Sequence, residues 1–261
     1  MMTVFTKSKF ADQHAIVTGG ARGIGAAISS LLAQRGARVT IVGRDQAVLD
    51  KHAKSLGDNA AALRCDVADE ASVKAAFKQA RDRFGDAHIL VNNAGQAKSE
   101  KFNKTTRAMW DQMISVNLTS VFLCTQEVLP AMIEAGNGRI VNVASTAGVK
   151  GAPRLTAYSA AKHGVVGLTR SLALETAKHG ITVNAVCPGY TDTDMTERGV
   201  RELMDAKKIS RDEARAMITR VIPRGVMTSP QEVANAVVWL CSSDASGVTG
   251  QALVVAGGEI T

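Results

Sequence analysis

The sequence of 261 residues has few aromatic residues and no long hydrophobic run. It contains two Trp, two Tyr and six Phe, and no stretch of eighteen consecutive apolar residues. A transmembrane helix needs about 20 mostly apolar residues, so we expect no membrane partner. Met1 to Lys9 also lacks the apolar stretch of a signal peptide. Both absences favour a cytoplasmic protein.

Cysteine and histidine are also scarce, and neither forms a ligand-like pattern. The four cysteines are far apart in the sequence, form no C-x-x-C pair and lie in apolar runs: Cys65, Cys124, Cys187 and Cys241. This favours reduced, buried thiols over disulfides. The five histidines show no metal-ligand spacing, so we expect no metal site.

The charge balance is basic, with a formal net charge of +7. Such a charge favours anionic partners. The basic residues are scattered, however, and the few aromatic residues do not alternate with them as they do on nucleic-acid surfaces. We therefore expect no nucleic-acid partner. A phosphate-bearing cofactor and an acidic substrate explain the charge more simply.

Short apolar runs alternate with longer helical patterns from Gln13 onward. Strands are expected over residues 14–18, 38–42, 60–64, 89–91, 139–143, 182–186 and 253–255. These runs show no polar alternation, as is typical of strands buried on both faces. Helices are expected between them, for example over residues 24–35 and 46–56. The pattern predicts an α/β fold: a doubly wound, Rossmann-like parallel sheet of about seven strands with helices on both faces.

No linker or repeat divides the chain, so we expect one domain over residues 1–261. Residues 190–224 interrupt the alternation with charged, helix-prone sequence and no strand. Excursions of this length are often substrate-binding loops or lids. An ordinary helical hairpin is the alternative.

A glycine-rich loop, Thr18-Gly-Gly-Ala-Arg-Gly-Ile-Gly25, follows the first expected strand and opens the first helix. Gly19, Gly23 and Gly25 would allow a sharp turn and a close approach to a pyrophosphate, which a helix N-terminus attracts. The spacing differs from the familiar G-x-G-x-x-G fingerprint. A purely structural turn is the alternative.

The second expected strand ends in Val42-Gly43-Arg44. Cofactors with a free ribose 2′-hydroxyl usually meet a carboxylate at this position. Gly43 supplies none, and two guanidinium groups, Arg44 and Arg22, could instead pair with a 2′-phosphate. This favours NADP(H) over NAD(H). Two solvated surface arginines are the alternative.

Tyr158 and Lys162 are four residues apart, which places them on one face of a helix. A free phenol has a pKa near 10 and is a poor base at neutral pH. An ammonium about 4 Å away would lower that pKa by up to roughly three units. We therefore expect Tyr158 to titrate near the operating pH, as acid–base catalysis requires.

Further motifs accompany this pair: Asn92-Asn-Ala-Gly95, Asn117 in Ser-Val-Asn-Leu, Ser145 after a strand, and Pro188-Gly189 after another. Together with the glycine loop they resemble the short-chain dehydrogenase/reductase family. The resemblance extends from Gln13 to Gly258. It implies a nicotinamide-dependent oxidoreductase acting on a carbonyl or an alcohol.

The resemblance also implies a catalytic role for four residues. Tyr158 would give a proton to the carbonyl oxygen and take it back in the reverse reaction. Lys162 would tune Tyr158 and bind the nicotinamide ribose, and Ser145 would donate a hydrogen bond to the substrate oxygen. Asn117 would hold a water that links Lys162 to solvent, although it could instead cap or bridge helices. The spacing to Tyr158 favours Ser145 over Thr146.

The remaining matching residues are expected at the cofactor. Asp66 would contact the adenine, although it could be an ordinary turn residue. Thr191 or Thr193 would contact the carboxamide. The full cofactor set is Gly19, Arg22, Gly23, Ile24, Gly25, Arg44, Asp66, Val67, Asn93, Ala94, Gly95, Tyr158, Lys162, Pro188, Gly189, Thr191 and Thr193.

The segments around Ser145 and Tyr158 look like 3-oxoacyl-thioester reductases and polyketide ketoreductases. Carrier-protein reductases often have a basic pair before the strand that leads to the serine, and residues 132–137 have none. A coenzyme A thioester or another ketone is therefore at least as good a substrate as a carrier-protein thioester.

Three hypotheses follow. The first is an NADPH-dependent 3-oxoacyl-thioester reductase, and the second is a dehydrogenase of another secondary alcohol, such as a cyclic alcohol, sugar or steroid. The third is a cofactor-binding protein without catalysis, which the four intact catalytic positions disfavour. The resemblance also implies a homotetramer.

Overall fold

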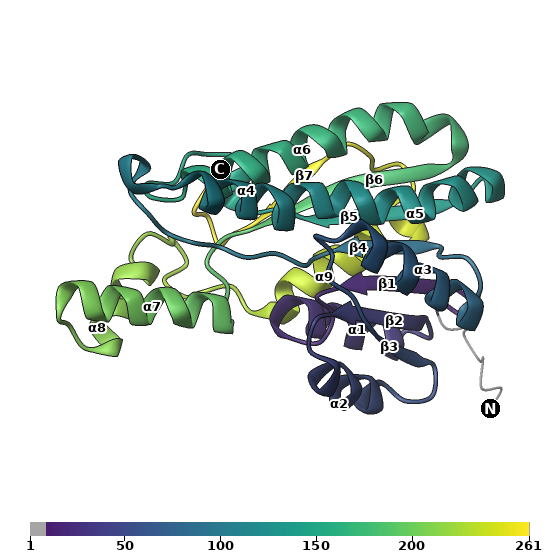
Figure 1. Ribbon diagram of the computed structural model, residues 1–261, viewed down its shortest axis with the longest axis horizontal. Helices are drawn as coiled ribbons and strands as arrows, with labels where there is room; N and C mark the ends of the chain where they lie inside the picture. The colour runs from purple at the N-terminus through teal and green to yellow at the C-terminus, as the bar shows by residue number, and fades with distance from the viewer. Residues whose placement is uncertain (1–8, 261) are drawn as a thin grey trace, which may run out of the picture.

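Parallel strands form a seven-stranded sheet in the computed structural model, which describes residues 9–260 (Figure 1). In sheet order they are β3 (Ala60–Arg64), β2 (Arg38–Gly43), β1 (His14–Thr18), β4 (Ile89–Asn92), β5 (Gly138–Val143), β6 (Ile181–Pro188) and β7 (Ala252–Val255). All neighbouring strands pair in parallel. The predicted Rossmann-like sheet is confirmed, and each expected strand overlaps an observed one. Residues 1–8, where we expect no signal peptide, lie outside the described residues.

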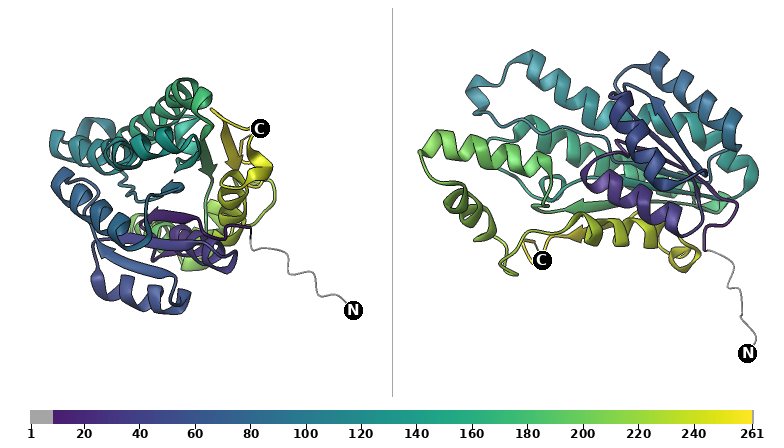
Figure 2. Two further views of the ribbon diagram at one scale, coloured as in Figure 1. Left: turned by 90° about the vertical axis from the view of Figure 1, so that its right-hand side faces the viewer. Right: turned by 90° about the horizontal axis from the view of Figure 1, so that it is seen from below.

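Helices cover both faces of the sheet (Figure 2). One layer contains α1 (Gly23–Gln34), α2 (Gln46–Leu56) and α9 (Pro230–Leu240). The other contains α3 (Glu70–Phe84), α5 (Ser120–Ala135) and α6 (Thr156–Thr176). Each layer buries the strands from one side, which explains why the strands carry apolar residues on both faces.

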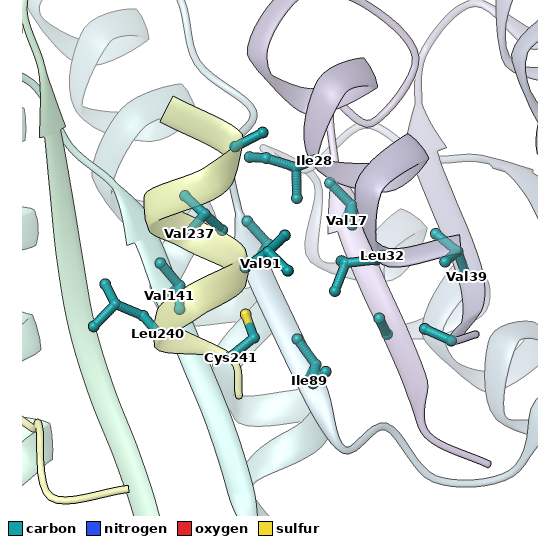
Figure 3. Packing of buried hydrophobic residues seen from close by; sticks show 14 of the residues in the cluster. Val17, Ile28, Leu32, Val39, Ile89, Val91, Val141, Val237, Leu240 and Cys241 are labelled. Atoms are coloured by element: carbon teal, nitrogen blue, oxygen red, sulfur yellow. The ribbon is translucent and has the colours of Figure 1, made fainter. Parts of the chain in front are cut away.

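The core between α1, α9 and the central strands is closely packed (Figure 3). Ile28 and Leu32 of α1 and Val237 of α9 are fully buried against Val17 and Val91 of the sheet. Burial of a side chain of this size contributes roughly 1.5–3 kcal/mol. This packing fixes the carboxyl ends of β1 and β4 side by side.

A continuous helical run, Arg107–Ala135, is long and apolar enough to cross a membrane by length and composition alone. It comprises α4 (Arg107–Ile114), a π-helical turn (Ser115–Thr119) and α5. Its side chains Cys124, Val128 and Met132 are buried in a core cluster with residues of the sheet. A core helix of a globular fold meets the same length and composition criteria.

Residues 190–224 form two helices that project beyond the carboxyl edge of the sheet (Figure 1). They are α7 (Asp194–Lys207) and α8 (Arg211–Thr219). The segment's β-type pairing is one isolated bridge, between Thr191 and Thr228. These helices therefore stand beside the edge at which ligands bind in open α/β sheets.

A candidate active site at the carboxyl edge of the sheet

A cleft of about 970 Å³ lies along the carboxyl ends of the strands. The sheet order reverses between β1 and β4, which is the point where such sheets bind ligands. The expected site residues that line the cleft are Gly19, Arg22, Gly23, Ile24, Arg44, Asp66, Val67, Asn93, Ala94, Gly95, Asn117, Ser145, Tyr158, Lys162, Pro188, Gly189, Thr191 and Thr193. The loops after six strands thus meet around one space.

Gly25 does not line the cleft. A Cβ on Gly25 would overlap the carbonyl oxygen of Gly19, so this glycine allows the loop to fold closely onto the first turn of α1. Gly19 and Gly23 have positive φ angles, 62° and 51°, which other residues rarely adopt. A Cβ on Gly23 would lie 3.2 Å from Cγ2 of Thr193, so the loop also approaches the start of α7 closely.

The glycine loop is hydrogen-bonded to the loop after β4. Thr18 Oγ1 accepts hydrogen bonds from the backbone amides of Asn93 and Ala94, both at 2.9 Å. The Asn93 side chain donates to the carbonyl oxygens of Thr18 at 2.9 Å and Gly19 at 3.2 Å. These bonds hold the two walls of the cleft at a fixed separation.

The arginines at the far end of the cleft are exposed, but they are not equivalent. Arg22 forms an ion pair with Asp45 at 2.9 Å, whereas Arg44 lines the cleft beside it. Asp45 also caps α2 by accepting from Val48 N at 3.3 Å. Sequence reasoning missed Asp45, although an aspartate directly before a helix is a typical N-cap.

Asp66 both lines the cleft and stabilises a turn. Its carboxylate accepts a hydrogen bond from Ala68 N at 3.0 Å. The turn role that we gave as the alternative is therefore present together with the position in the cleft.

Tyr158 and Lys162 project into the other end of the cleft from the first turns of α6. Tyr158 is half-buried, and Lys162 is only 4 % exposed. Nζ of Lys162 lies 5.7 Å from the centroid of the Tyr158 ring and donates a hydrogen bond to Val143 O at 2.8 Å. The ammonium is therefore anchored to the end of β5.

The expected lowering of the Tyr158 pKa by Lys162 is wrong for this structure. Burial raises the pKa of Tyr158 above its ordinary value, and a hydrogen bond with Ser145 offsets this only in part. Burial also lowers the pKa of Lys162 to about 8. A charge about 4 Å from the phenol would have lowered its pKa, but the Lys162 ammonium is directed at Val143 O instead. The phenol thus keeps its proton at neutral pH and is equipped to act as an acid.

Ser145 caps a short 3₁₀ turn, Thr146–Gly148, that follows β5. Its Oγ accepts a hydrogen bond from Ala147 N at 3.1 Å. Because this bond uses a lone pair of the hydroxyl, the hydroxyl proton is available for donation. The turn therefore orients Ser145 as a donor beside Tyr158.

Asn117 lies in the π-helical turn and is fully buried. Its side chain donates to Gln96 O at 2.9 Å and to Met113 O at 3.0 Å, and it accepts from Gln96 N at 3.1 Å. The Asn117 side chain thus joins its own helical run to the loop after β4, which is neither a helix cap nor the bridge between helices that we gave as the alternative. A Cβ on Gly95 would lie 2.8 Å from Asn117 Oδ1 and 3.6 Å from Lys162 Nζ, so the absence of a side chain at Gly95 lets the loop after β4 pack closely against Asn117.

Residues 13–203 match the family model described as short chain dehydrogenase. The chain belongs to the short-chain dehydrogenase family. The resemblance that the motifs indicated is thereby confirmed.

Relatives of this short-chain dehydrogenase match nearly its whole length. It is 45 % identical to granaticin polyketide synthase putative ketoacyl reductase 1 of Streptomyces violaceoruber, over 97 % of this chain and 95 % of the relative. It is 39 % identical to the 3-oxoacyl-[acyl-carrier-protein] reductase FabG of Vibrio cholerae, over 94 % of this chain and 96 % of the relative.

Two solved structures resemble this short-chain dehydrogenase equally well. A variant of actinorhodin polyketide ketoreductase with NADPH has a TM-score of 0.91 at 40 % identity, covering 95 % of this chain and 97 % of that one. Levodione reductase has a TM-score of 0.91 at 33 % identity, covering 96 % and 98 %.

Sequence reasoning about this short-chain dehydrogenase missed several residues of the cleft besides Asp45. One of them is Gln96, which binds Asn117 through its backbone. It could have been predicted from its position directly after the Asn92–Gly95 motif. Met195 and Arg198 line the cleft from α7, and no sequence pattern in that charged segment indicates which face of the helix is directed at the cleft. Within residues 9–260, no group of three or more His, Cys, Asp and Glu side chains is placed to hold a metal ion.

Proposed function

We propose that the protein reduces 3-oxoacyl thioesters to 3-hydroxyacyl thioesters with NADPH. The observation that carries this proposal is that one continuous cleft joins the glycine loop to Ser145 and Tyr158. A dinucleotide held at the loop would extend towards two hydroxyl donors. Relatives named as ketoacyl and 3-oxoacyl reductases support the same reaction.

The residues present fit a dinucleotide. The N-terminus of α1 and the glycine loop offer backbone N–H groups to a pyrophosphate. Gly95 and Lys162 line the same cleft, where the nicotinamide ribose would lie. Arg44 and Arg22 favour a 2′-phosphate, and the solved ketoreductase with NADPH supports NADP(H). When bound, the cofactor supplies the hydride.

Side chains of the cleft would supply the proton that the substrate carbonyl oxygen takes up during reduction. The Ser145 hydroxyl would donate a hydrogen bond to the substrate carbonyl and stabilise negative charge on its oxygen. The Tyr158 phenol, whose raised pKa keeps it protonated, would transfer its proton to that oxygen. Lys162 would bind the ribose, and Asn117 would hold the water that links Lys162 to solvent.

The two helices of residues 190–224 would cover the acyl chain. Met195 lines the cleft from α7, and Met217 and Val221 expose apolar surface on and beside α8. Methionine side chains adapt to irregular apolar ligands. We propose that residues 1–261 form one catalytic domain in which this segment is the substrate-binding insertion.

A second candidate is the reduction of a cyclic or other free ketone. The similarity to levodione reductase at 33 % identity favours it. Lack of a basic pair in residues 132–137, which would assist carrier-protein docking, is compatible with it.

Steady-state assays separate these functions. The purified protein would be supplied with NADPH or NADH and with acetoacetyl-CoA, levodione or cyclohexanone, and cofactor oxidation would be followed by absorbance. The proposal predicts the highest kcat/KM for acetoacetyl-CoA with NADPH. A higher kcat/KM for either cyclic ketone would favour the second candidate, and no turnover of any ketone would contradict both.

We also propose a cytoplasmic homotetramer. Phe122 of α5 is 47 % exposed and Leu174 of α6 is 84 % exposed, so these long helices offer apolar surface to symmetry mates. All four cysteines are free and buried, which suits a reducing compartment. Light scattering after size-exclusion chromatography tests the assembly, and a monomer would contradict it.

A further inference from the structure

A turn near the C-terminus lies against the active-site loops. This C-terminal turn, residues 256–259, follows β7 and is closed by a hydrogen bond from Glu259 N to Ala256 O at 3.1 Å. The Glu259 side chain is only 6 % exposed. A carboxylate this deeply buried is costly unless it is paired, so its contacts need an explanation.

Glu259 contacts the loop that carries Ser145. Its Oε1 lies 3.1 Å from Nζ of Lys150 and accepts a 3.5 Å hydrogen bond from Oγ1 of Thr146. Nζ of Lys150 also donates to the Glu259 backbone carbonyl at 3.4 Å. The residue directly after Ser145 is thereby tied to the end of the chain.

The other carboxylate oxygen faces the turn after β6. A Cβ on Gly189 would lie 2.5 Å from Oε2 of Glu259 and 2.8 Å from Cβ of Ala256, so only glycine fits against the carboxylate there. Oε2 is buried without a hydrogen-bond partner among the described residues. An unpaired buried oxygen lowers stability. The ion pair with Lys150 and the hydrogen bond from Thr146, both on Oε1, therefore have to offset the cost of burying this carboxylate against the Gly189 turn.

Both ends of the 190–224 segment rest on this region. At its start, Gly189 N donates to Val255 O at 3.1 Å, and at its end Arg224 N donates to Gly257 O at 3.1 Å. The C-terminal turn therefore contacts the Ser145 loop through Glu259, packs against Gly189 just before the segment, and is hydrogen-bonded to Arg224 at its end.

The opposite side of the Ser145 loop is also fixed. A Cβ on Gly148 would lie 2.8 Å from the carbonyl oxygen of Lys162, so the 3₁₀ turn is pressed against α6. α6 therefore contacts the Ser145 loop on one side. On the other side, Glu259 contacts the same loop through Thr146 and Lys150, so its carboxylate helps to fix the position of the Ser145 hydroxyl.

We propose that Glu259 is a positioning residue for carbonyl reduction. It holds the Ser145 loop and the Gly189 turn at the separation that lets a ketone contact Ser145 and Tyr158 together. This inference rests on the proposed function. Misplacement of a reacting group by about 1 Å can cost roughly 100-fold in rate.

The test is a graded series at position 259, measured on the full-length protein with NADPH and whichever ketone the wild type reduces best. Glu259→Gln keeps the shape and an acceptor for Thr146 but loses the charge, and Glu259→Met loses both. We expect kcat to fall roughly 10-fold for the first and roughly 100-fold for the second. KM for NADPH should stay within about twofold, because the glycine loop is untouched, and the deuterium isotope effect on kcat should rise as hydride transfer becomes limiting.

Two further variants guard against a purely structural effect. Lys150→Met removes the partner from an exposed position and should lower kcat in the same direction, with an effect that is not additive with Glu259→Gln. Asp82→Asn removes an exposed ion pair with Lys78 on α3 and should leave kcat unchanged. These two remain informative if the variants at position 259 fail to fold.

The outcomes separate the two proposals. A wild-type protein that reduces no ketone contradicts the proposed function. An active wild type with unchanged kcat and isotope effect in Glu259→Gln and Lys150→Met contradicts the positioning role alone. A rise in KM for NADPH equal to the loss in kcat would also overturn it.

Discussion

Lys162 directs its ammonium at the carbonyl oxygen of Val143, 2.8 Å away, and lies 5.7 Å from the centre of the Tyr158 ring. The strongest contact of the lysine is therefore with the end of β5 and not with the phenol. This relationship separates the two titrations, because burial raises the pKa of Tyr158 while it lowers that of Lys162 to about 8. As the pH rises, Lys162 therefore loses its charge before Tyr158 loses its proton.

This separation predicts how the reaction depends on pH. Reduction needs Tyr158 protonated and Lys162 charged, and the pKa of about 8 means that Lys162 loses its charge first as the pH rises. We expect kcat/KM for the cofactor, which reports groups of the free enzyme, to be level below pH 7 and to fall above about pH 8. A pH series with NADPH at saturating ketone measures this. A level profile up to pH 9.5 would contradict the assignment.

The arginines predict a selective effect on cofactor binding. Arg44 is free of an ion pair with Asp45, whereas Arg22 is bound to it, so Arg44 is the better placed of the two for a 2′-phosphate. We expect Arg44→Ala to weaken NADPH binding about tenfold, equivalent to about 1.4 kcal/mol, and to leave NADH binding unchanged. Fluorescence titration of both cofactors measures the two Kd values. An equal rise in the Kd values for NADPH and NADH would show that Arg44 does not bind the 2′-phosphate.

Asp45→Asn is the matched change on the other partner. It removes the negative charge next to Arg22 while keeping an N-cap for α2. The freed Arg22 should bind NADPH as tightly as before or more tightly. Weaker NADPH binding in this variant would mean that the Arg22–Asp45 pair is itself part of the site.

His14 predicts a loss of stability in acid. The side chain is fully buried in β1, with Nδ1 2.8 Å from Gly85 O and Nε2 2.9 Å from Thr40 Oγ1. Burial lowers its pKa from 6.5 to about 4. The native state thus favours the neutral ring, so this stability is fully present above pH 6.5 and is lost as the pH falls towards 4. The loss amounts to about 3 kcal/mol.

Urea unfolding at pH 7 and pH 4.5 measures this effect. The wild type should lose more free energy of unfolding between the two pH values than His14→Asn, because the variant lacks the titrating ring. Carboxylates contribute equally to both proteins, so the difference isolates His14. Equal losses would mean that His14 does not titrate as described.

The sequence predicted the sheet and most of the cleft for one reason. Strands buried on both faces leave short apolar runs without polar alternation, and functional side chains follow directly where those runs end, as Ser145 follows β5 and Gly189 follows β6. Parallel order then brings those ends to one edge. Topology alone was enough to collect these residues.

What the sequence did not predict depends on the directions of side chains across the fold. Burial of the phenol raises the pKa of Tyr158, because the Lys162 ammonium that was expected to lower it is directed at Val143 instead. The pairing of Arg22 with Asp45 joins two separate loops. Glu259 meets Thr146 across more than a hundred residues of sequence. Such contacts follow from packing of the finished fold, and no local pattern encodes them.

Tyr158→Phe is the most direct test of the account, whose central claim is that this phenol transfers the proton. This substitution removes only the hydroxyl, and Asp82→Asn, which breaks the exposed ion pair with Lys78 on α3, is the control outside the site. The decisive measurement is single-turnover oxidation of bound NADPH by the preferred ketone. The account predicts a rate roughly 10²–10⁴-fold lower in Tyr158→Phe, with the Kd for NADPH and the rate of Asp82→Asn near wild type. An undiminished rate in Tyr158→Phe would contradict it.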